Sequence, residues 1–123
     1  MTPSLPLRVK PENLPAPSTE RQWSQQVRAI ADMYGWTMKY HTHRSDRSDP
    51  GWPDEVLGHP VHRRLIVVEL KTDTGRLRPE QRQWLHLLEA CGVEAALWRP
   101  RDLDTVLHVL GPAQQRAMLP VDL

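Results

Sequence analysis

Two periods of apolar and polar residues run along the chain, and together they predict an α/β fold. Helical spacing begins after Thr19, which can form a capping box with Gln22, and it ends at Gly35. Two more stretches have the same period, and the predicted helices cover residues 19–35, 79–92 and 102–111. Their buried sides are predicted to carry Trp23, Val27, Ile30, Ala31, Tyr34, Gln81, Trp84, Leu88, Cys91, Leu103, Val106, Leu107 and Leu110.

Strand-like segments lie between these helices. Residues 36–41 alternate apolar and polar side chains, while 54–57, 63–71 and 93–98 are apolar segments bounded by turn residues or charges. The order is helix, three strands, helix, strand, helix. It predicts an αβββαβ core with a mixed four-stranded sheet flanked by helices, plus a C-terminal helix.

Length and composition limit the chain to one domain. The 123 residues predict a Pro-rich arm over 1–17, a single domain over 18–111 and a tail over 112–123 with weak helical character. Cys91 is the only cysteine and cannot form an internal disulfide, so a reducing cytoplasm is expected. No signal-peptide pattern or bilayer-long apolar run is present. The formal net charge of +1 does not by itself favour nucleic-acid binding.

The third predicted strand ends in charged residues. A period of two places Glu69 and Lys71 on one face, about 6.6 Å apart along the strand. Leu70 points to the other face and continues the buried row of Ile66 and Val68. An acid and a base on the inner row of a strand indicate a functional site, and the plain alternative is an edge-strand ion pair.

Asp54 is the second acidic candidate. Adjacent strands lie about 4.8 Å apart, so Asp54 and Glu69 can converge if their strands pair in a suitable register. Two carboxylates at one point repel unless a cation lies between them, and Mg²⁺ takes oxygen ligands of this kind. The backbone carbonyl of Leu70 would be a third ligand, and Lys71 would stabilise charge on a phosphate or help to deprotonate a water molecule. This set suits phosphodiester hydrolysis, although Asp54 could also be only a turn residue.

Other polar residues have structural alternatives. Glu20 lies three residues before Trp23, on the apolar stripe of the first helix, but an acid in the first turn also favours the helix dipole without any catalytic role. A structural zinc site is a second possibility, but no closed zinc motif is formed by the spacings of His41, His43, His59, His62 and Cys91.

The combined pattern resembles the PD-(D/E)XK nuclease superfamily, which implies a restriction-endonuclease-like fold. Over residues 20–100 it is most similar to the VRR-NUC branch, which is itself similar to archaeal Holliday junction resolvases. The chain has no Val-Arg-Arg triplet of the kind that names the branch. The resemblance rests on Gly51-Trp52-Pro53-Asp54, Glu69-Leu70-Lys71, Gly75-Arg76-Leu77, Pro79-Glu80-Gln81, Trp84 and Trp98-Arg99-Pro100.

The resemblance implies a role for each matching residue. Asp54 and Glu69 would bind the metal, Lys71 would be the catalytic lysine, and Glu20 would reach the metal through water. Gln81 matches a glutamine that lies beside the site. Candidates for nucleic-acid contacts near such a site are Arg44, Arg47, Arg76, Arg78, His41, His43 and Trp52, of which Trp52 would either stack on a base or simply pack.

We therefore expect a Mg²⁺- or Mn²⁺-dependent DNA endonuclease that is selective for branched or junction DNA and acts as a homodimer. One alternative is a nucleic-acid-binding module that keeps the fold without catalysis. Another is a nuclease that acts on RNA, because none of these residues distinguishes the two nucleic acids.

Overall fold

A mixed four-stranded sheet forms the centre of the protein in a computed structural model that describes residues 9–42, 49–112, 114–121 and 123. The strand order is β1-β2-β3-β4, with antiparallel pairing among the first three strands and parallel pairing between β3 and β4. The predicted fold class is confirmed. The elements are η1 (Pro11–Asn13), α1 (Glu20–Met33), β1 (Met38–His41), β2 (Glu55–His59), β3 (Arg64–Leu70), α2 (Pro79–Ala90), β4 (Glu94–Trp98), η2 (Pro100–Asp102) and α3 (Leu103–Leu110).

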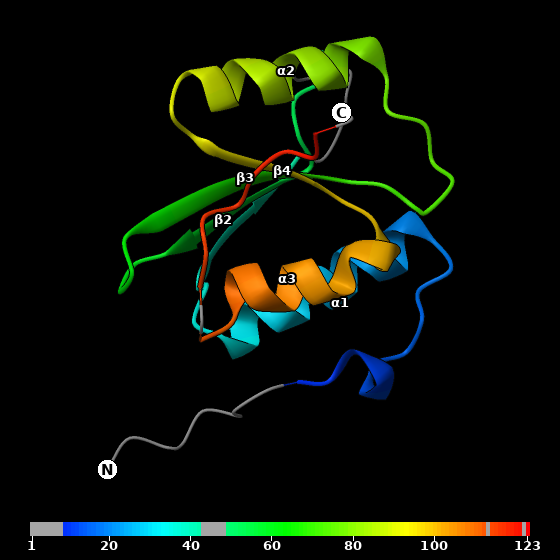
Figure 1. Ribbon diagram of the computed structural model, residues 1–123, viewed down its shortest axis with the longest axis vertical. Helices are drawn as coiled ribbons and strands as arrows, with labels where there is room; N and C mark the ends of the chain where they lie inside the picture. Colours follow the sequence, from blue (N-terminus) through cyan, green and yellow to red (C-terminus); the bar gives the residue numbers. More distant parts are fainter. Residues whose placement is uncertain (1–8, 43–48, 113, 122) are drawn as a thin grey trace.

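Helices cover both faces of the sheet. Figure 1 shows α1 and α3 on one face and α2 on the other. The period of two in β3 places Ile66, Val68 and Leu70 in the main core, together with residues of α1 and α3. A smaller cluster around Leu85 and Leu97 lies beneath α2. The alternate residues of β3, which include its charged end, therefore face the α2 side.

Buried tryptophans tie the helices to the ends of the strands. The indole N–H of Trp23 donates to the carbonyl of Trp98 at 3.0 Å, and that of Trp36 donates to the carbonyl of Leu110 at 2.9 Å. The Trp98 carbonyl also accepts from the backbone N–H of Lys71 at 3.1 Å. The first turn of α1 is consequently held beside the carboxyl end of β3.

Strand β2 extends beyond its predicted end. The sequence predicts a turn at residues 58–60, yet Gly58 pairs with Met38 and Leu65 inside the sheet. A Cβ at Gly58 would lie 3.1 Å from the Cβ of Met38, so this glycine permits close approach of two strands and does not form the turn. The turn itself follows His59.

Two predictions for the C-terminal half are wrong. Cys91 is exposed and outside the core, because it is the C-cap that follows the last helical residue, Ala90. The weak helix expected in the tail is absent from residues 114–120, which have no regular secondary structure. Within the described part of the chain, no helix is long and apolar enough to cross a membrane. The domain boundaries remain predictions, although Val9 and Leu14 already pack against the main core.

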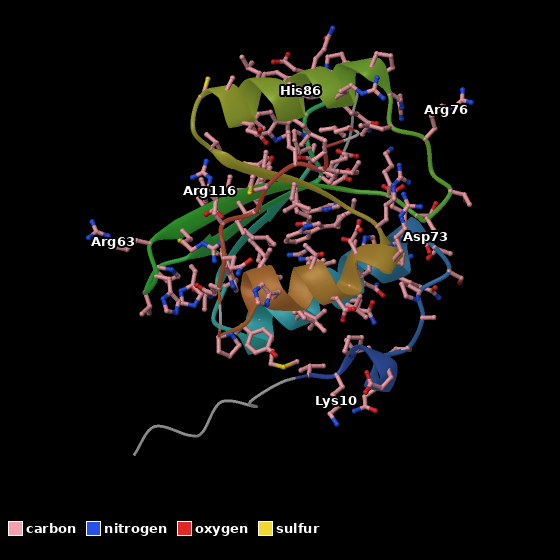
Figure 2. All side chains as sticks on the ribbon, viewed as in Figure 1. Lys10, Arg63, Asp73, Arg76, His86 and Arg116 are labelled. Carbon is pink, nitrogen blue, oxygen red and sulfur yellow. The ribbon has the colours of Figure 1, made fainter. Side chains whose placement is uncertain are left out.

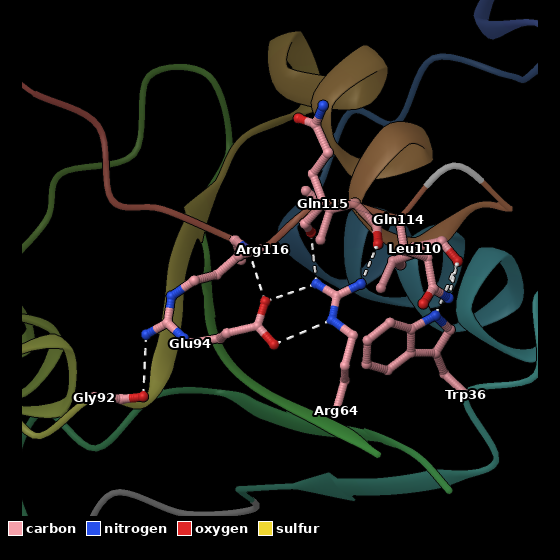
Figure 3. A network of polar contacts seen from close by, with 10 residues as sticks. Trp36, Arg64, Gly92, Glu94, Leu110, Gln114, Gln115 and Arg116 are labelled. Carbon is pink, nitrogen blue, oxygen red and sulfur yellow. Dashed lines mark hydrogen bonds and ion pairs between the residues drawn. The ribbon is translucent and has the colours of Figure 1, made fainter. Parts of the chain in front are cut away.

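The ion pair of Arg64 and Glu94 anchors the tail. The Arg64 guanidinium donates to both carboxylate oxygens of Glu94, at 3.1 and 2.6 Å, and to the carbonyls of Val109 and Gln115 (Figure 3). Glu94 Oε1 also accepts from the backbone N–H of Ala117 at 2.7 Å. These two side chains thus provide hydrogen-bond partners for backbone groups of the non-helical tail.

Substitution of Arg64 is expected to destabilise the fold. Arg64→Ala leaves the largely buried carboxylate of Glu94 without its cation, which typically costs about 3–5 kcal/mol. Urea denaturation should show this loss in the free energy of unfolding. The neighbouring exposed Arg63, changed to Ala, is the matched control and should shift stability by less than about 0.5 kcal/mol. Equal effects of the two substitutions would contradict the role of Arg64.

Candidate active site

Segments that are distant in the sequence meet at the charged end of β3. Figure 1 shows the first turns of α1 and α2 at the same end of the molecule as the loop that leaves β3. A cavity of about 230 Å³ lies there, and its walls include all five predicted catalytic residues. It is lined by Glu20, Thr42, Asp49, Gly51, Trp52, Asp54, Glu69, Lys71, Arg78, Glu80 and Gln81.

Glu69 is the buried acid at the centre of this cavity. Its side chain is only 1% exposed, and burial together with the negative charge of Asp54 raises its pKa from 4.5 to about 9. The ammonium of Lys71 lies 3.7 Å from Glu69 Oε2 and opposes part of this rise in pKa. Without a metal ion at the site, this raised pKa favours the protonated form of Glu69 at neutral pH.

Asp54 is held at the junction of three strands. Its Oδ2 accepts a hydrogen bond of 2.9 Å from the backbone N–H of Leu70, and its carbonyl accepts from the backbone N–H of Thr42 at the same distance. The Thr42 hydroxyl donates to the carbonyl of Pro53 at 2.8 Å. These contacts replace ladder pairing at the end of the sheet and bring the Asp54 carboxylate next to Glu69.

Glu20 reaches the same cavity from the first turn of α1. The residue is exposed, so it does not lie in the apolar stripe of the helix as its spacing predicts. Partial burial of its carboxyl group, and then the charge of Asp54, raise its pKa, while Lys71 and Arg78 act in the opposite direction. The interaction with Asp54 shows that the two carboxyl groups lie in one electrostatic environment.

Gln81 links α2 to the buried acid. Its Nε2 donates to Glu69 Oε2 at 3.1 Å, and its Oε1 accepts from the backbone N–H of Arg78 at 2.8 Å. Both ends of the amide are therefore engaged, and the first turn of α2 is tied to the carboxylate. The predicted position of Gln81 beside Asp54 and Glu69 agrees with this geometry.

Arg99 organises the loop that follows Lys71, a role that its sequence context did not indicate. Its guanidinium donates to the carbonyls of Thr72 and Gly75, at 2.7 and 2.6 Å. A Cβ at Gly75 would lie 3.0 Å from the hydroxyl of Thr72, so the loop is also compact. Lys71 is thus held between its pairing with β4 and a fixed loop.

Trp52 packs against α2 and also lines the cavity. Its ring meets that of Trp84 edge-on, with centroids 5.1 Å apart, and the Trp84 indole donates to the carbonyl of Pro50 at 3.0 Å. Gly51 has a φ of +86°, and a Cβ there would lie 2.5 Å from the backbone of Glu80. A glycine is required for this close approach. Base stacking by Trp52 remains a prediction.

The residues predicted to contact nucleic acid lie in different parts of the molecule. Arg78 lines the cavity, whereas Arg76 projects outward from the loop before α2 (Figure 2). His41 lies on the other side of the sheet, where it borders a second cavity beside α1. Arg44, Arg47 and His43 lie outside the described residues.

The oxygen atoms at the site fit a hard divalent cation. Glu69 Oε1 is buried and has no hydrogen-bond partner among the residues that the structure describes. A cation between Asp54 and Glu69 would contact this oxygen and offset the repulsion between the two acids. In the described ranges, no group of three or more His, Cys, Asp or Glu side chains could hold a metal ion alone. A main-chain oxygen or water would have to complete the ligand set of a cation at this site.

Sequence reasoning missed a second buried acid, Glu55. It is fully buried at the start of β2 and accepts hydrogen bonds from the Ser24 hydroxyl at 3.0 Å and from His41 Nδ1 at 2.9 Å. The available signal was an acid within an apolar strand, directly after Asp54.

Two comparisons with known proteins found a match to this chain. The model of the VRR-NUC domain family matches residues 10–102, which is most of the chain. A solved structure described as a VRR_NUC domain protein is similar, with a TM-score of 0.49 and 16% identity over 76% of this chain and 91% of that one. None of the curated proteins that were compared matches the chain.

The raised pKa of Glu69 predicts that the metal-free protein loses stability as pH rises. Between the ordinary value of 4.5 and the folded value of about 9, the folded state binds more protons at this carboxyl than the unfolded state does. The stabilising contribution is fully present below pH 4.5 and is lost as pH approaches 9.

Urea denaturation in EDTA, repeated across this pH range, should show a decline in the free energy of unfolding. Glu69→Gln removes the titrating group and should make that decline shallower. Glu12→Gln, on an exposed residue of η1, serves as the control and should follow the wild type. If Glu69→Gln also follows the wild type, the assigned titration is wrong.

Proposed function

The chain belongs to the VRR-NUC domain family, and on that premise we propose that it is a divalent-metal-dependent endonuclease that hydrolyses phosphodiester bonds in DNA. The observation that carries this proposal is the buried Glu69, which shares a cavity with Asp54 and Lys71 and has an unpartnered oxygen among the described residues. The ammonium of Lys71 offsets only part of the rise in the pKa of Glu69, so a second cation beside Asp54 and Glu69 would stabilise the ionised pair.

The metal would be held by the carboxylates of Asp54 and Glu69 and by the carbonyl of Leu70, with Glu20 reaching it through water. When bound, Mg²⁺ or Mn²⁺ would supply Lewis-acid stabilisation of phosphate charge and a more acidic water molecule. The hydrogen bond from Leu70 N–H orients Asp54 for this role. Glu20 lines the same cavity and can accept a proton from a water molecule there.

Lys71 would stabilise negative charge on the phosphate. Its ammonium lies 3.7 Å from Glu69 and is largely buried, so it is held in place and poorly hydrated. A cation in such surroundings interacts more strongly with developing charge than one in water. Gln81 is a positioning residue, because it acts by fixing the Glu69 carboxylate.

The preference for branched or junction DNA belongs to the same proposal. Arg78 is an exposed cation that lines the cavity, and Arg76 is an exposed cation that projects outward from the loop before α2 (Figure 2). Such groups contact the phosphate backbone without reading sequence. Contacts to the phosphate backbone favour selection of DNA by its shape and not by its sequence. The competing candidates are an RNA-directed nuclease and a silent binding module, and the intact set of Glu20, Asp54, Glu69 and Lys71 argues against the silent module.

A homodimer is the proposed assembly, and an uncovered sheet face offers the contact surface. Met38 and Tyr40 of β1 and Leu65 of β3 are 61%, 60% and 51% exposed on the face that α2 leaves open. Met38 and Leu65 flank Gly58 in adjacent strands, so they form one apolar patch. A twofold contact would bury this patch on both copies.

Substitution of the catalytic candidates should abolish cleavage while the fold persists. Asp54→Ala, Glu69→Ala and Lys71→Ala each remove charge from the reacting centre and should lower the Mg²⁺-dependent cleavage rate by about 10²–10³-fold or more. Gln81→Ala should cost about 10–100-fold, because only positioning is lost. Glu12→Gln is the control.

Rates should be measured on linear, flapped and four-way-junction DNA and on matching RNA, with circular dichroism as the check on folding. Wild-type protein that binds these substrates but leaves them intact with Mg²⁺ and Mn²⁺ would support the silent module. Equal cleavage by the wild type and by a triple variant that combines Asp54→Ala, Glu69→Ala and Lys71→Ala would show that the assignment of the site is wrong.

Disruption of the apolar patch should dissociate the dimer. The double variant Met38→Lys with Leu65→Lys places charges on the proposed contact and should sediment as a monomer. Leu87→Lys alters an equally exposed leucine on α2, 53% exposed, and should leave the mass unchanged. Analytical ultracentrifugation distinguishes these outcomes, and a monomeric wild type at micromolar concentration would exclude this dimer.

A further inference from the structure

A cavity of about 350 Å³ lies outside the proposed catalytic site, and three of the described residues that line it are arginines. They come from different elements: Arg82 from α2, Arg99 from the end of β4, and Arg101 from η2. The other lining residues are Leu77, Leu97, Asp102, Pro120 and Leu123. We call this space the arginine cavity. Three positive charges around one space repel one another, so a bound anion would stabilise their arrangement.

The charges of these guanidinium groups are not neutralised by the described part of the protein. Within those residues, none of the three groups forms an ion pair with a carboxylate. Asp102 is the only acid among the described lining residues, and its Oδ2 accepts from the backbone N–H of Arg99 at 2.9 Å. Asp73 accepts in the same way from the backbone N–H of Arg101 at 2.9 Å. These two acids therefore hold the backbone of the cavity wall and leave the guanidinium charges uncompensated.

The guanidinium of Arg99 is held in place by hydrogen bonds that do not cancel its charge. Its Nη1 donates to the carbonyls of Thr72 and Gly75, whereas its Nε and Nη2 have no partner among the residues that the structure describes. The edge formed by Nε and Nη2 can donate to two oxygens of one phosphate. Leu77 and Leu97 border the same cavity. Apolar groups there exclude water, which strengthens the attraction between a guanidinium and an anion.

The arginine cavity adjoins the catalytic cavity at the loop of residues 72–78. Leu77 lines the arginine cavity, and the next residue, Arg78, lines the catalytic cavity. Arg82 follows Arg78 by four residues, so the two arginines are neighbours on one side of α2, about one helical turn apart. Lys71 lies in the catalytic cavity at the other end of the loop. A DNA strand with a phosphate at Lys71 could therefore continue past Arg78 to Arg82.

We propose that the arginine cavity binds a backbone phosphate of the substrate DNA, away from the bond that is cleaved, through Arg82, Arg99 and Arg101. The identity of this ligand as substrate DNA rests on the proposed nuclease function. A phosphodiester suits the cavity because its charged oxygens match the planar donors of arginine. Every nucleotide carries this group, so the contact would position the DNA without reading its sequence.

The salt dependence of DNA binding tests this contact, with Lys71→Ala as the parent protein so that the DNA stays intact. Arg82→Ala and Arg101→Ala, each added to the parent, should lower the affinity for a short duplex about tenfold, as for the loss of a charge-assisted hydrogen bond. Each should also reduce the slope of log K against log salt concentration by about 0.9, and the two together by about 1.8. Arg82→Lys keeps the charge and should keep the parental slope. Arg63→Ala, at the β2–β3 turn on the opposite side of the molecule (Figure 2), is the matched control and should behave like the parent.

DNA with single uncharged phosphates then locates the contact. Each duplex of a series carries one methylphosphonate, at successive positions around the bond that the wild type cleaves. In the parent, a methylphosphonate at one position away from that bond should lower affinity about tenfold. The double variant with Arg82→Ala and Arg101→Ala should be insensitive at that position, because the contact is already lost, and should stay sensitive at the cleaved phosphate.

The outcomes separate this phosphate site from the proposed function. If the wild type cleaves DNA but both arginine variants keep the parental salt slope and methylphosphonate sensitivity, only the phosphate site is wrong. If the wild type does not cleave DNA but the variants lose salt slope, the nuclease proposal is wrong and the binding site stands. Loss of slope on RNA alone would overturn the choice of DNA as the ligand.

The choice of variants keeps the test independent of folding. The side chains of Arg82 and Arg101 are exposed and have no hydrogen-bond or ion-pair partner in the described ranges, so their removal should leave the fold intact. Thermal melting of each variant checks this expectation. Arg99 is left unchanged, because its substitution would also release the carbonyls of Thr72 and Gly75.

Discussion

Burial of the Glu69 carboxyl at the end of a central strand is the constraint on which the site depends. A carboxylate buried in this position is unfavourable, and the positions of the surrounding residues determine how readily it ionises. Gln81 donates to one oxygen, Lys71 lies close to the same oxygen, and Asp54 adds a second negative charge nearby. A carboxylate pair of this kind is tolerated when a cation completes it, and its high proton affinity in the metal-free protein follows from the same cause.

Contacts far from the acids keep the site in place. The Trp98 carbonyl accepts from both the Trp23 indole and the backbone of Lys71, so α1 and the end of β3 share one anchor. Arg99 then fixes the loop beyond Lys71, and Gly51 allows the loop before β2 to touch α2. The geometry of the candidate catalytic residues is thus set by the packing of rigid elements, which suits positioning within fractions of an ångström.

Local periodicity explains how much could be predicted from the sequence. The period of two in β3 assigned Glu69 and Leu70 to opposite faces, and this assignment depends only on neighbouring residues. The roles of Arg99, Arg64 and Glu55 could not be predicted in this way, because their partners lie 14 to 51 residues away in the sequence. The error at Cys91 has a local cause, since the helical stripe was continued one residue past the last turn of α2.

The adjacent acids Asp54 and Glu55 show how one strand end can serve both faces of a sheet. Asp54 precedes the strand and is turned toward Glu69, while Glu55 is the first paired residue and points to α1. Asp54 Oδ2 accepts from the backbone N–H of Leu70, and one oxygen of Glu55 accepts from Ser24 and His41. These two adjacent acids therefore tie the start of β2 to the end of β3 on one side and to α1 and β1 on the other.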